Sequence, residues 1–189
     1  LGGIINIITK EPLGKAMHLK VNSYVDNIEN YNVNASVQTR ISKSLPISFN
    51  IGRQFFRGKD FDKATRTLDW KPKEKIFADF NTVYKHKNLS FRLGSNFFTE
   101  ELNDRSNAEN NLITYYGYNS KYYTYRWDNQ VQLNLKFNNY SQFQWQNAFN
   151  IYTRRKSTIK RNLVTGEENA FRPQDQDTTN FRLINSRGV

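Results

Sequence analysis

The sequence predicts an all-β protein, an antiparallel up-and-down meander of about eight strands that forms part of a transmembrane β-barrel. Apolar and polar residues alternate with period two along most of the 189-residue chain, as in strands with one apolar face. The connections between these segments alternate in length, from short turns to long polar loops. No apolar run approaches the roughly 18 residues of a membrane helix, so the chain does not span a membrane as a helix.

The composition limits the classes of protein further. The mean hydropathy of −0.81 and the 37% of hydrophobic residues argue against a large solid core, whereas the 15% of aromatic residues argue against a disordered chain. The net charge of +11 suits nucleic acid, an acidic ligand or an anionic membrane surface and does not choose among them. Because the chain has no cysteine, a disulfide scaffold and a thiolate metal site are excluded.

Eight segments read as strands, in the order 17–25, 31–41, 45–55, 76–84, 89–97, 123–137, 143–151 and 179–187. Their predicted apolar faces carry Met17, Leu19, Val21 and Val25; Tyr31, Val33, Ala35, Val37 and Ile41; Leu45, Ile47, Phe49, Ile51 and Phe55; Ile76, Ala78, Phe80 and Tyr84; Leu89, Phe91, Leu93 and Phe97; Tyr123, Tyr125, Trp127, Val131, Leu133, Leu135 and Phe137; and Phe143, Trp145, Phe149 and Ile151. The eighth segment alternates only weakly.

The connections differ at the two ends of the predicted strands. Residues 42–44, 86–87 and 138–140 form short turns, and the opposite connections are 26–30, 58–75, 100–121 and 156–177, three of which are long and polar. An outer-membrane barrel has short periplasmic turns and long external loops. A soluble sandwich, with its apolar face against a second sheet, stays open as an alternative but gives no reason for this asymmetry.

Aromatic residues gather near both ends of the strands, as interfacial girdles do. They are Phe55, Phe56, Phe97, Phe98, Tyr123, Tyr125 and Trp127 on the loop side, and Tyr84, Phe137, Tyr140 and Phe143 on the turn side. Three polar residues occupy positions that alternate in step with the apolar residues and so belong to the predicted apolar face: Arg53, Asn129 and Asn147. We expect Arg53, and Asn129 with it, near an interface, and a bulge or a neighbouring surface at Asn147.

The first residues resemble a known family. The run Gly2-Gly3-Ile4-Ile5-Asn6-Ile7-Ile8-Thr9-Lys10 is similar to the segment that closes the plug domain of TonB-dependent outer-membrane receptors, where Gly-x-Ile-Asn-Ile-x-Thr-Lys leads into the first barrel strand. The residues that carry this plug-to-barrel motif are Gly2, Gly3, Ile4, Asn6, Ile7 and Thr9. The resemblance implies that residues 1–12 end a plug domain and that residues 13–189 begin a barrel of the 22-stranded type, as a piece of a longer protein.

The resemblance also implies a function and partners. Such receptors bind and import a scarce nutrient, and Asn6 favours the siderophore and vitamin type over the SusC-like type. The expected partners are outer-membrane lipid and lipopolysaccharide, a small nutrient ligand, and the TonB complex through a more N-terminal part. The expected location is the outer membrane of a Gram-negative bacterium, with long loops outside and short turns in the periplasm.

The candidate binding residues lie in the long connections. For a nutrient ligand we single out Arg57, Arg66, Tyr115, Tyr116 and Tyr118, because basic and phenolic side chains suit anionic or catechol-like ligands. For lipopolysaccharide phosphates the candidates are Arg154, Arg155, Lys156 and Lys160. The alternatives are that the basic residues only hydrate the loops and that the tyrosines continue an interfacial girdle.

Nothing in the sequence predicts an enzyme, a cofactor or a metal site. His18 and His86 lie far apart without ligand spacing, and the loop acids Glu100, Glu101 and Asp104 are typical of solvated charge. The glycines near residue 2 lack the pattern of a phosphate-binding loop.

Two rival functions stay open. One is a complete eight-stranded outer-membrane barrel that anchors or adheres. The other is a soluble β-rich nucleic-acid binder. For the second, basic and aromatic residues should share one face, whereas here the aromatics follow the apolar face and the basic residues concentrate in loops, so nucleic acid is not an expected partner.

Overall fold

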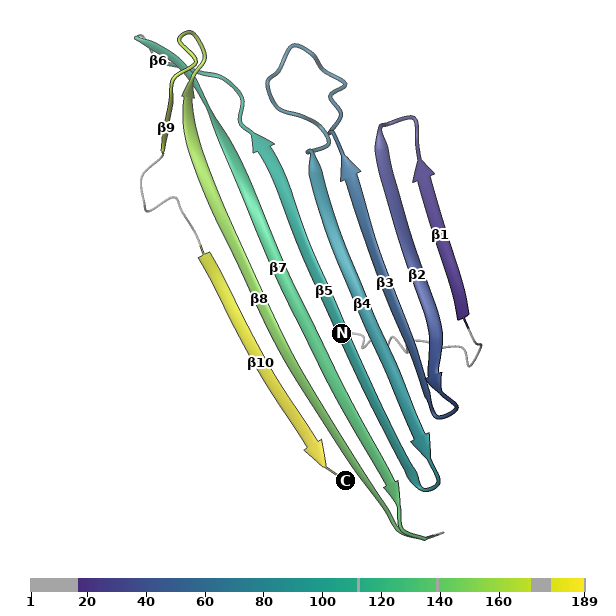
Figure 1. Cartoon of the computed structure of the whole chain (residues 1–189). Coiled ribbons are helices and arrows are strands. Elements are labelled where there is room, and N and C mark those ends of the chain that lie inside the picture. Colours follow the sequence, from purple (N-terminus) through teal and green to yellow (C-terminus); the bar gives the residue numbers. More distant parts are fainter. Residues whose placement is uncertain (1–16, 112, 139, 171–177, 189) are drawn as a thin grey trace, which may run out of the picture.

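The computed structural model describes residues 17–111, 113–138, 140–170 and 178–188. Its strands are β1 (Met17–Val25), β2 (Asn30–Ser42), β3 (Leu45–Phe56), β4 (Lys73–His86), β5 (Leu89–Arg105), β6 (Glu109–Asn111), β7 (Thr114–Lys136), β8 (Gln142–Asn162), β9 (Glu168–Ala170) and β10 (Thr178–Gly188). They form one antiparallel sheet in the order β1-β2-β3-β4-β5-β7-β8-β10, with β6 paired to β7 and β9 to β8 (Figure 1). The predicted all-β meander is confirmed. The sheet is open rather than closed into a barrel, and the plug-to-barrel motif lies outside the described residues.

The pairing register keeps the apolar residues of seven long strands, β1 to β5, β7 and β8, on one face. Leu19 stands opposite Val37, Val37 opposite Phe49, and Phe49 opposite Phe80. Directly opposite residues in an antiparallel pair share a face, so these pairs form rows across the sheet. The same phase continues through β5, β7 and β8, where Phe91 aligns with Leu133 and Leu133 with Trp145.

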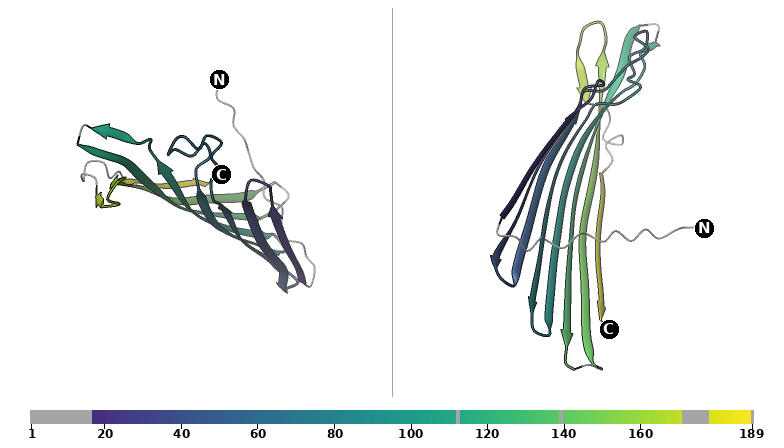
Figure 2. Two further views of the ribbon diagram at one scale, coloured as in Figure 1. Left: turned by 90° about the horizontal axis from the view of Figure 1, so that it is seen from above. Right: turned by 90° about the vertical axis from the view of Figure 1, so that its right-hand side faces the viewer.

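The sheet is a single curved layer, as its two further views show (Figure 2). Among the described residues the buried hydrophobic ones are Phe56 and Val83. On the apolar face, Leu19 and Val21 each expose 63% of their surface. An apolar face of this extent requires a cover, because soluble monomers rarely leave such an area in water. Within the described ranges, no helix is long and apolar enough to cross a membrane.

Short turns at one end of the sheet keep the apolar residues of neighbouring strands on the same face. The β2–β3 turn is residues 43–44, and a register shift between Arg40 and Ser42 brings the two apolar faces into line. The β4–β5 turn is residues 87–88, with Lys87 at φ 47°. Successive turns are displaced along the strands, because Ser44 O accepts from Lys85 N and Asn88 O accepts from Lys136 N. This stagger is visible in Figure 1 and is the feature that tilts strands in barrels.

At the other end, two expected loops are largely strands. The predicted loop over residues 100–121 contains the end of β5, all of β6 and the start of β7, and the predicted loop over residues 156–177 contains the end of β8 and β9. Both faces of these extensions carry polar side chains, so the apolar alternation stops while the backbone pairing continues. Residues 57–72 do form a largely irregular connection, closed by a bridge between Lys59 and Trp70.

Two polar residues on the apolar face, Arg53 and Asn129, form side-chain hydrogen bonds there. The Arg53 Nε donates to Glu74 Oε1 at 2.6 Å, beside the ring of Phe55. The Ser95 Oγ donates to Asn129 Oδ1 at 2.7 Å and accepts from Trp127 Nε1 at 2.9 Å. These contacts lower the cost of placing polar groups on this face.

A cross-strand pair of glycine and phenylalanine packs on the polar face. Gly52 of β3 stands opposite Phe77 of β4 and is buried. A Cβ at Gly52 would overlap the Phe77 ring. The missing side chain therefore gives the ring its place over the backbone of β3, an arrangement that compensates for a glycine in a strand.

We predict that Gly52→Ala lowers the free energy of unfolding by about 1–3 kcal/mol, because the Phe77 ring must leave its place. Gly94→Ala is the matched control, because that glycine is also buried in a strand on the polar face but faces the ends of the flexible side chains of Asn81 and Gln130. Urea unfolding of the refolded variants measures both changes. Equal effects of the two substitutions would contradict this role of the Gly52–Phe77 pair.

Candidate ligand-binding surface

The hairpin of β7 and β8 extends well beyond the apolar face at the loop end of the sheet. Tyr116, Tyr118 and Tyr122 lie at even positions of β7, on the side of the polar face. In β8, Lys160 pairs with Tyr118 and Lys156 pairs with Tyr122. We call the set Tyr116, Tyr118, Tyr122, Arg154, Lys156 and Lys160 the tyrosine ladder.

Cations and phenol rings alternate along this ladder. The Lys160 Nζ lies 3.8 Å from the centroid of the Tyr116 ring, and Tyr116 meets Tyr118 edge to face at 5.7 Å. The Tyr122 ring has Arg154 Cζ at 5.1 Å and Lys156 Nζ at 5.8 Å from its centroid. Cation–π contacts of this kind hold the positive groups in place while their outer donors stay available. The ladder thus offers cationic donors and flat rings on one surface.

A carboxylate beside Tyr116 controls the protonation of its hydroxyl. Glu109 of β6 stands directly opposite Tyr116. The hydrogen bond with the Glu109 carboxylate, followed by desolvation, raises the pKa of Tyr116 to about 12. The phenol is therefore neutral throughout the physiological range and serves as a hydrogen-bond donor rather than as a phenolate.

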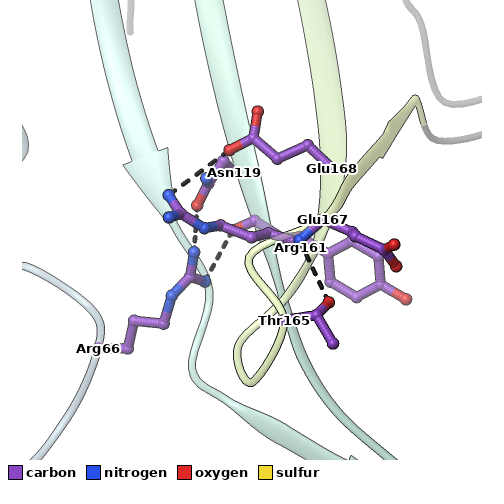
Figure 3. A network of polar contacts seen from close by, with 7 residues as sticks. Arg66, Asn119, Arg161, Thr165, Glu167 and Glu168 are labelled. Atoms are coloured by element: carbon purple, nitrogen blue, oxygen red, sulfur yellow. Dashed lines mark hydrogen bonds and ion pairs between the residues drawn. The ribbon is translucent and has the colours of Figure 1, made fainter.

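One arginine ties the irregular connection 57–72 to the extended hairpin. The Arg66 Nη1 donates to the Ser106 carbonyl at 3.0 Å and to the Tyr118 carbonyl at 3.3 Å, and its Nη2 donates to the Asn119 side chain (Figure 3). Between β5 and β6 three residues, 106–108, lie opposite only two residues of β7, 117–118. The hydrogen-bond ladder between these two segments therefore opens into a bulge. Gly117 makes room, because a Cβ there would overlap Arg66 Nη1.

The same connection packs its aromatic residues against the polar face. Trp70 lies 6.4 Å from Phe56 and 5.5 Å from Phe61, measured between ring centroids. The Lys71 Nζ pairs with Asp104 Oδ2 at 2.7 Å. The connection is therefore fixed at several points to the strands beside it.

The structure brings only part of the predicted nutrient-binding set together. Tyr116 and Tyr118 share the ladder, and Arg66 contacts the backbone of Tyr118. Tyr115 points to the opposite side of β7 by parity. Arg57 is exposed and ion-paired with Glu29 at 3.6 Å, in another part of the loop end.

The predicted lipopolysaccharide residues divide between the two faces. Arg154, Lys156 and Lys160 join the tyrosine ladder on the polar side. Arg155 lies opposite Tyr123, on the side of the apolar face. Basic residues that are adjacent in β8, such as Arg154 and Arg155, therefore lie on opposite faces of the sheet.

Sequence reasoning did not single out Arg105, Glu109, Gly117 or Asn119. The bulge at residues 106–108 reverses the parity before β6 and so places Glu109 opposite Tyr116, while Arg105, Gly117 and Asn119 border the bulge. The signal available in the sequence was the run of tyrosine and threonine, which favours strand over loop. No group of three histidine or acidic side chains that could hold a metal ion occurs within the described ranges.

None of the family models, curated proteins or solved structures with which the chain was compared matches it. The fold and the surface define the class: an open antiparallel β-sheet with one apolar face, one polar face and an extended cationic and aromatic end.

We predict that Tyr116 ionises near pH 12. Because its folded pKa is raised, the stabilisation from its protonated form is complete below the usual tyrosine pKa of about 10 and is lost as the pH rises through about 12. The difference in 295 nm absorbance between the wild-type protein and Tyr116→Phe isolates this titration.

Glu109→Gln provides the matched change, because it keeps the size of the partner and removes its charge. The Tyr116 titration should then move down toward pH 10. An unchanged titration in Glu109→Gln would show that the carboxylate is not the cause.

Proposed function

We propose that the chain is part of the barrel wall of a TonB-dependent outer-membrane receptor, which binds and imports a scarce nutrient such as a ferric siderophore or vitamin. The observation that carries this proposal is the apolar face that continues without a break in phase across seven of the eight long strands, β1 to β5, β7 and β8. Lipid is the cover that such a face fits, because outer-membrane barrels turn their apolar face outward and their polar face to the lumen.

The height of the apolar face supports a membrane. On β7 it runs from Tyr125 to Leu135, close to the roughly 9–11 residues of a tilted membrane strand. Charged pairs end it at the loop side, where Arg53 meets Glu74 and Lys121 Nζ meets Glu101 Oε1 at 3.3 Å. Below them, Phe97 and Tyr125 pack edge to face at 5.5 Å, as in an interfacial girdle.

The opposite face supports a hydrated lumen. The Asn50 Nδ2 donates to Asp79 Oδ2 at 2.9 Å, and the Lys75 Nζ pairs with Glu100 Oε2 at 3.2 Å. Polar side chains in such networks remain solvated rather than buried in a core. The tyrosine ladder continues this wall toward the loops, where it would meet an anionic ligand before transport.

The open edges favour a large barrel over a small one. β1 and β10 lie at opposite edges of the sheet, and within the described ranges neither has a second partner strand. A membrane barrel leaves no edge unpaired, because lipid cannot satisfy the backbone groups. Eight long strands equal the number in a complete small barrel, which therefore remains the second candidate.

We predict that Val131→Arg prevents stable assembly in the outer membrane, whereas Gln130→Arg does not. The two residues are neighbours on β7, Val131 on the apolar face and Gln130 on the polar face. An arginine on the lipid side costs about 2–4 kcal/mol near the bilayer midplane. Membrane fractionation and the heat-dependent shift in gel mobility measure assembly.

The opposite ranking of the two variants would assign lipid to the other face. A wild-type chain found only in the soluble fraction would overturn the membrane proposal and favour a soluble β-rich protein.

The importer itself is tested by the size of the protein in source cells. An antibody against residues 100–121 should detect an outer-membrane band far heavier than 22.4 kDa. A band near 22.4 kDa in the same fraction would instead support the small anchoring barrel and would contradict the proposal of an importer.

A further inference from the structure

Three arginines from three parts of the chain meet above the apolar face. Arg66 comes from the irregular connection, Arg105 ends β5 and Arg161 lies near the end of β8, and all three line one cavity with Asn119 and the turn at residues 162–166. Figure 3 shows the guanidinium groups of Arg66 and Arg161 close to Asn119.

The cluster carries more positive charge than its neighbours neutralise. Glu168 Oε1 lies 3.5 Å from Arg161 Nη1. In the part of the chain that the structure describes, no ion pair to a carboxylate is formed by Arg66 or Arg105. Burial, then the charges of Arg105 and Arg161, lowers the pKa of Arg66. Because an arginine stays protonated despite such a shift, the cluster keeps a net charge of about +2.

The backbone holds the central guanidinium in a fixed orientation. The carbonyl groups of Ser106 and Tyr118 and the side chain of Asn119 accept from Arg66, which uses only part of its five donors. Gly117 leaves the space that this orientation needs. The arginine is thus positioned before any ligand arrives, which lowers the cost of binding.

We propose that this cavity binds a phosphate dianion through Arg66, Arg105 and Arg161. A phosphate monoester offers three charged oxygens to three guanidinium groups, and its charge balances that of the cluster. A single carboxylate offers only two oxygens and half of the charge. The site is separate from the tyrosine ladder, since Arg105, Asn119 and Arg161 share the parity of the apolar face.

The phosphate has two possible sources, free phosphate and the head group of a lipid. The cavity lies beyond the charged pairs that end the apolar face, which is the height of lipid phosphates if that face contacts a membrane. Only the lipid source rests on the proposed function. The anion site itself rests on the arginine geometry.

The test is a calorimetric titration of inorganic phosphate into the protein in zwitterionic detergent. Arg105→Gln and Arg161→Gln should each weaken binding about tenfold, the loss expected for one charged hydrogen-bonding partner. Arg57→Gln removes the same charge from an exposed arginine outside the cluster and should change the dissociation constant by less than about twofold.

Gly117→Ala separates geometry from charge. It retains all three arginines but displaces the Arg66 guanidinium, so we expect a loss of about tenfold as well. Circular dichroism of each variant checks that the sheet is intact. No measurable phosphate binding by the folded wild-type protein, or an equal loss in Arg57→Gln, would overturn the proposal.

A second titration distinguishes the sources. Micelles containing phosphatidic acid are compared with micelles containing phosphatidylcholine, in the wild-type protein and in Arg105→Gln. Tighter binding of phosphatidic acid than of inorganic phosphate, lost in Arg105→Gln, assigns the site to a lipid head group. Binding of inorganic phosphate alone assigns it to a free phosphate, and this result leaves the membrane location intact.

Discussion

The backbone ladder between antiparallel strands is the interaction on which the rest of this structure depends. A single layer has almost no interior, so few side chains are buried deeply enough to hold the strands together. The strands stay in place through cross-strand hydrogen bonds, and the value of those bonds rises when water is excluded from one face. The register of the ladder then decides which side chains face the cover and which face water.

Where a turn would place the apolar residues of two neighbouring strands on opposite faces, a bulge beside the turn brings them back to one face. The two-residue turn between β2 and β3 is accompanied by a bulge between Arg40 and Ser42, and after it Val37 and Phe49 lie on the same face. At the loop end, the bulge at residues 106–108 instead moves the following residues to the other face of the sheet, and it thereby places Glu109 beside Tyr116. It also opens the space that the Arg66 guanidinium fills.

The period-two alternation was sufficient to predict seven of the eight long strands, their antiparallel order and the short turns, whereas β10 was predicted from a segment that alternates only weakly. It failed where both faces carry polar residues, in the extensions of β5, β7 and β8, because the apolar signal ends there while the backbone pairing does not. Five of the six residues of the tyrosine ladder, Tyr116, Tyr118, Arg154, Lys156 and Lys160, were candidates from the sequence, but they were assigned to two separate sets. The arginine cluster was not, because Arg66, Arg105 and Arg161 come together only through a bulge and a long connection that no local pattern encodes.

Parity within a strand separates the two chemical surfaces of the loop end. Arg154 and Arg155 are neighbours in sequence, yet Arg154 lies against Tyr122 on the polar side and Arg155 lies beside Tyr123 on the apolar side. Likewise, Lys160 contacts the ring of Tyr116 while Arg161 lines the arginine cavity. If lipid covers the apolar face, one basic strand end would serve both proposed partners, a ligand in water on the lumen side and a phosphate at the membrane surface on the outer side. A one-residue shift in the β7–β8 register would exchange these roles, so the ladder that holds the sheet also fixes the assignment of its charges.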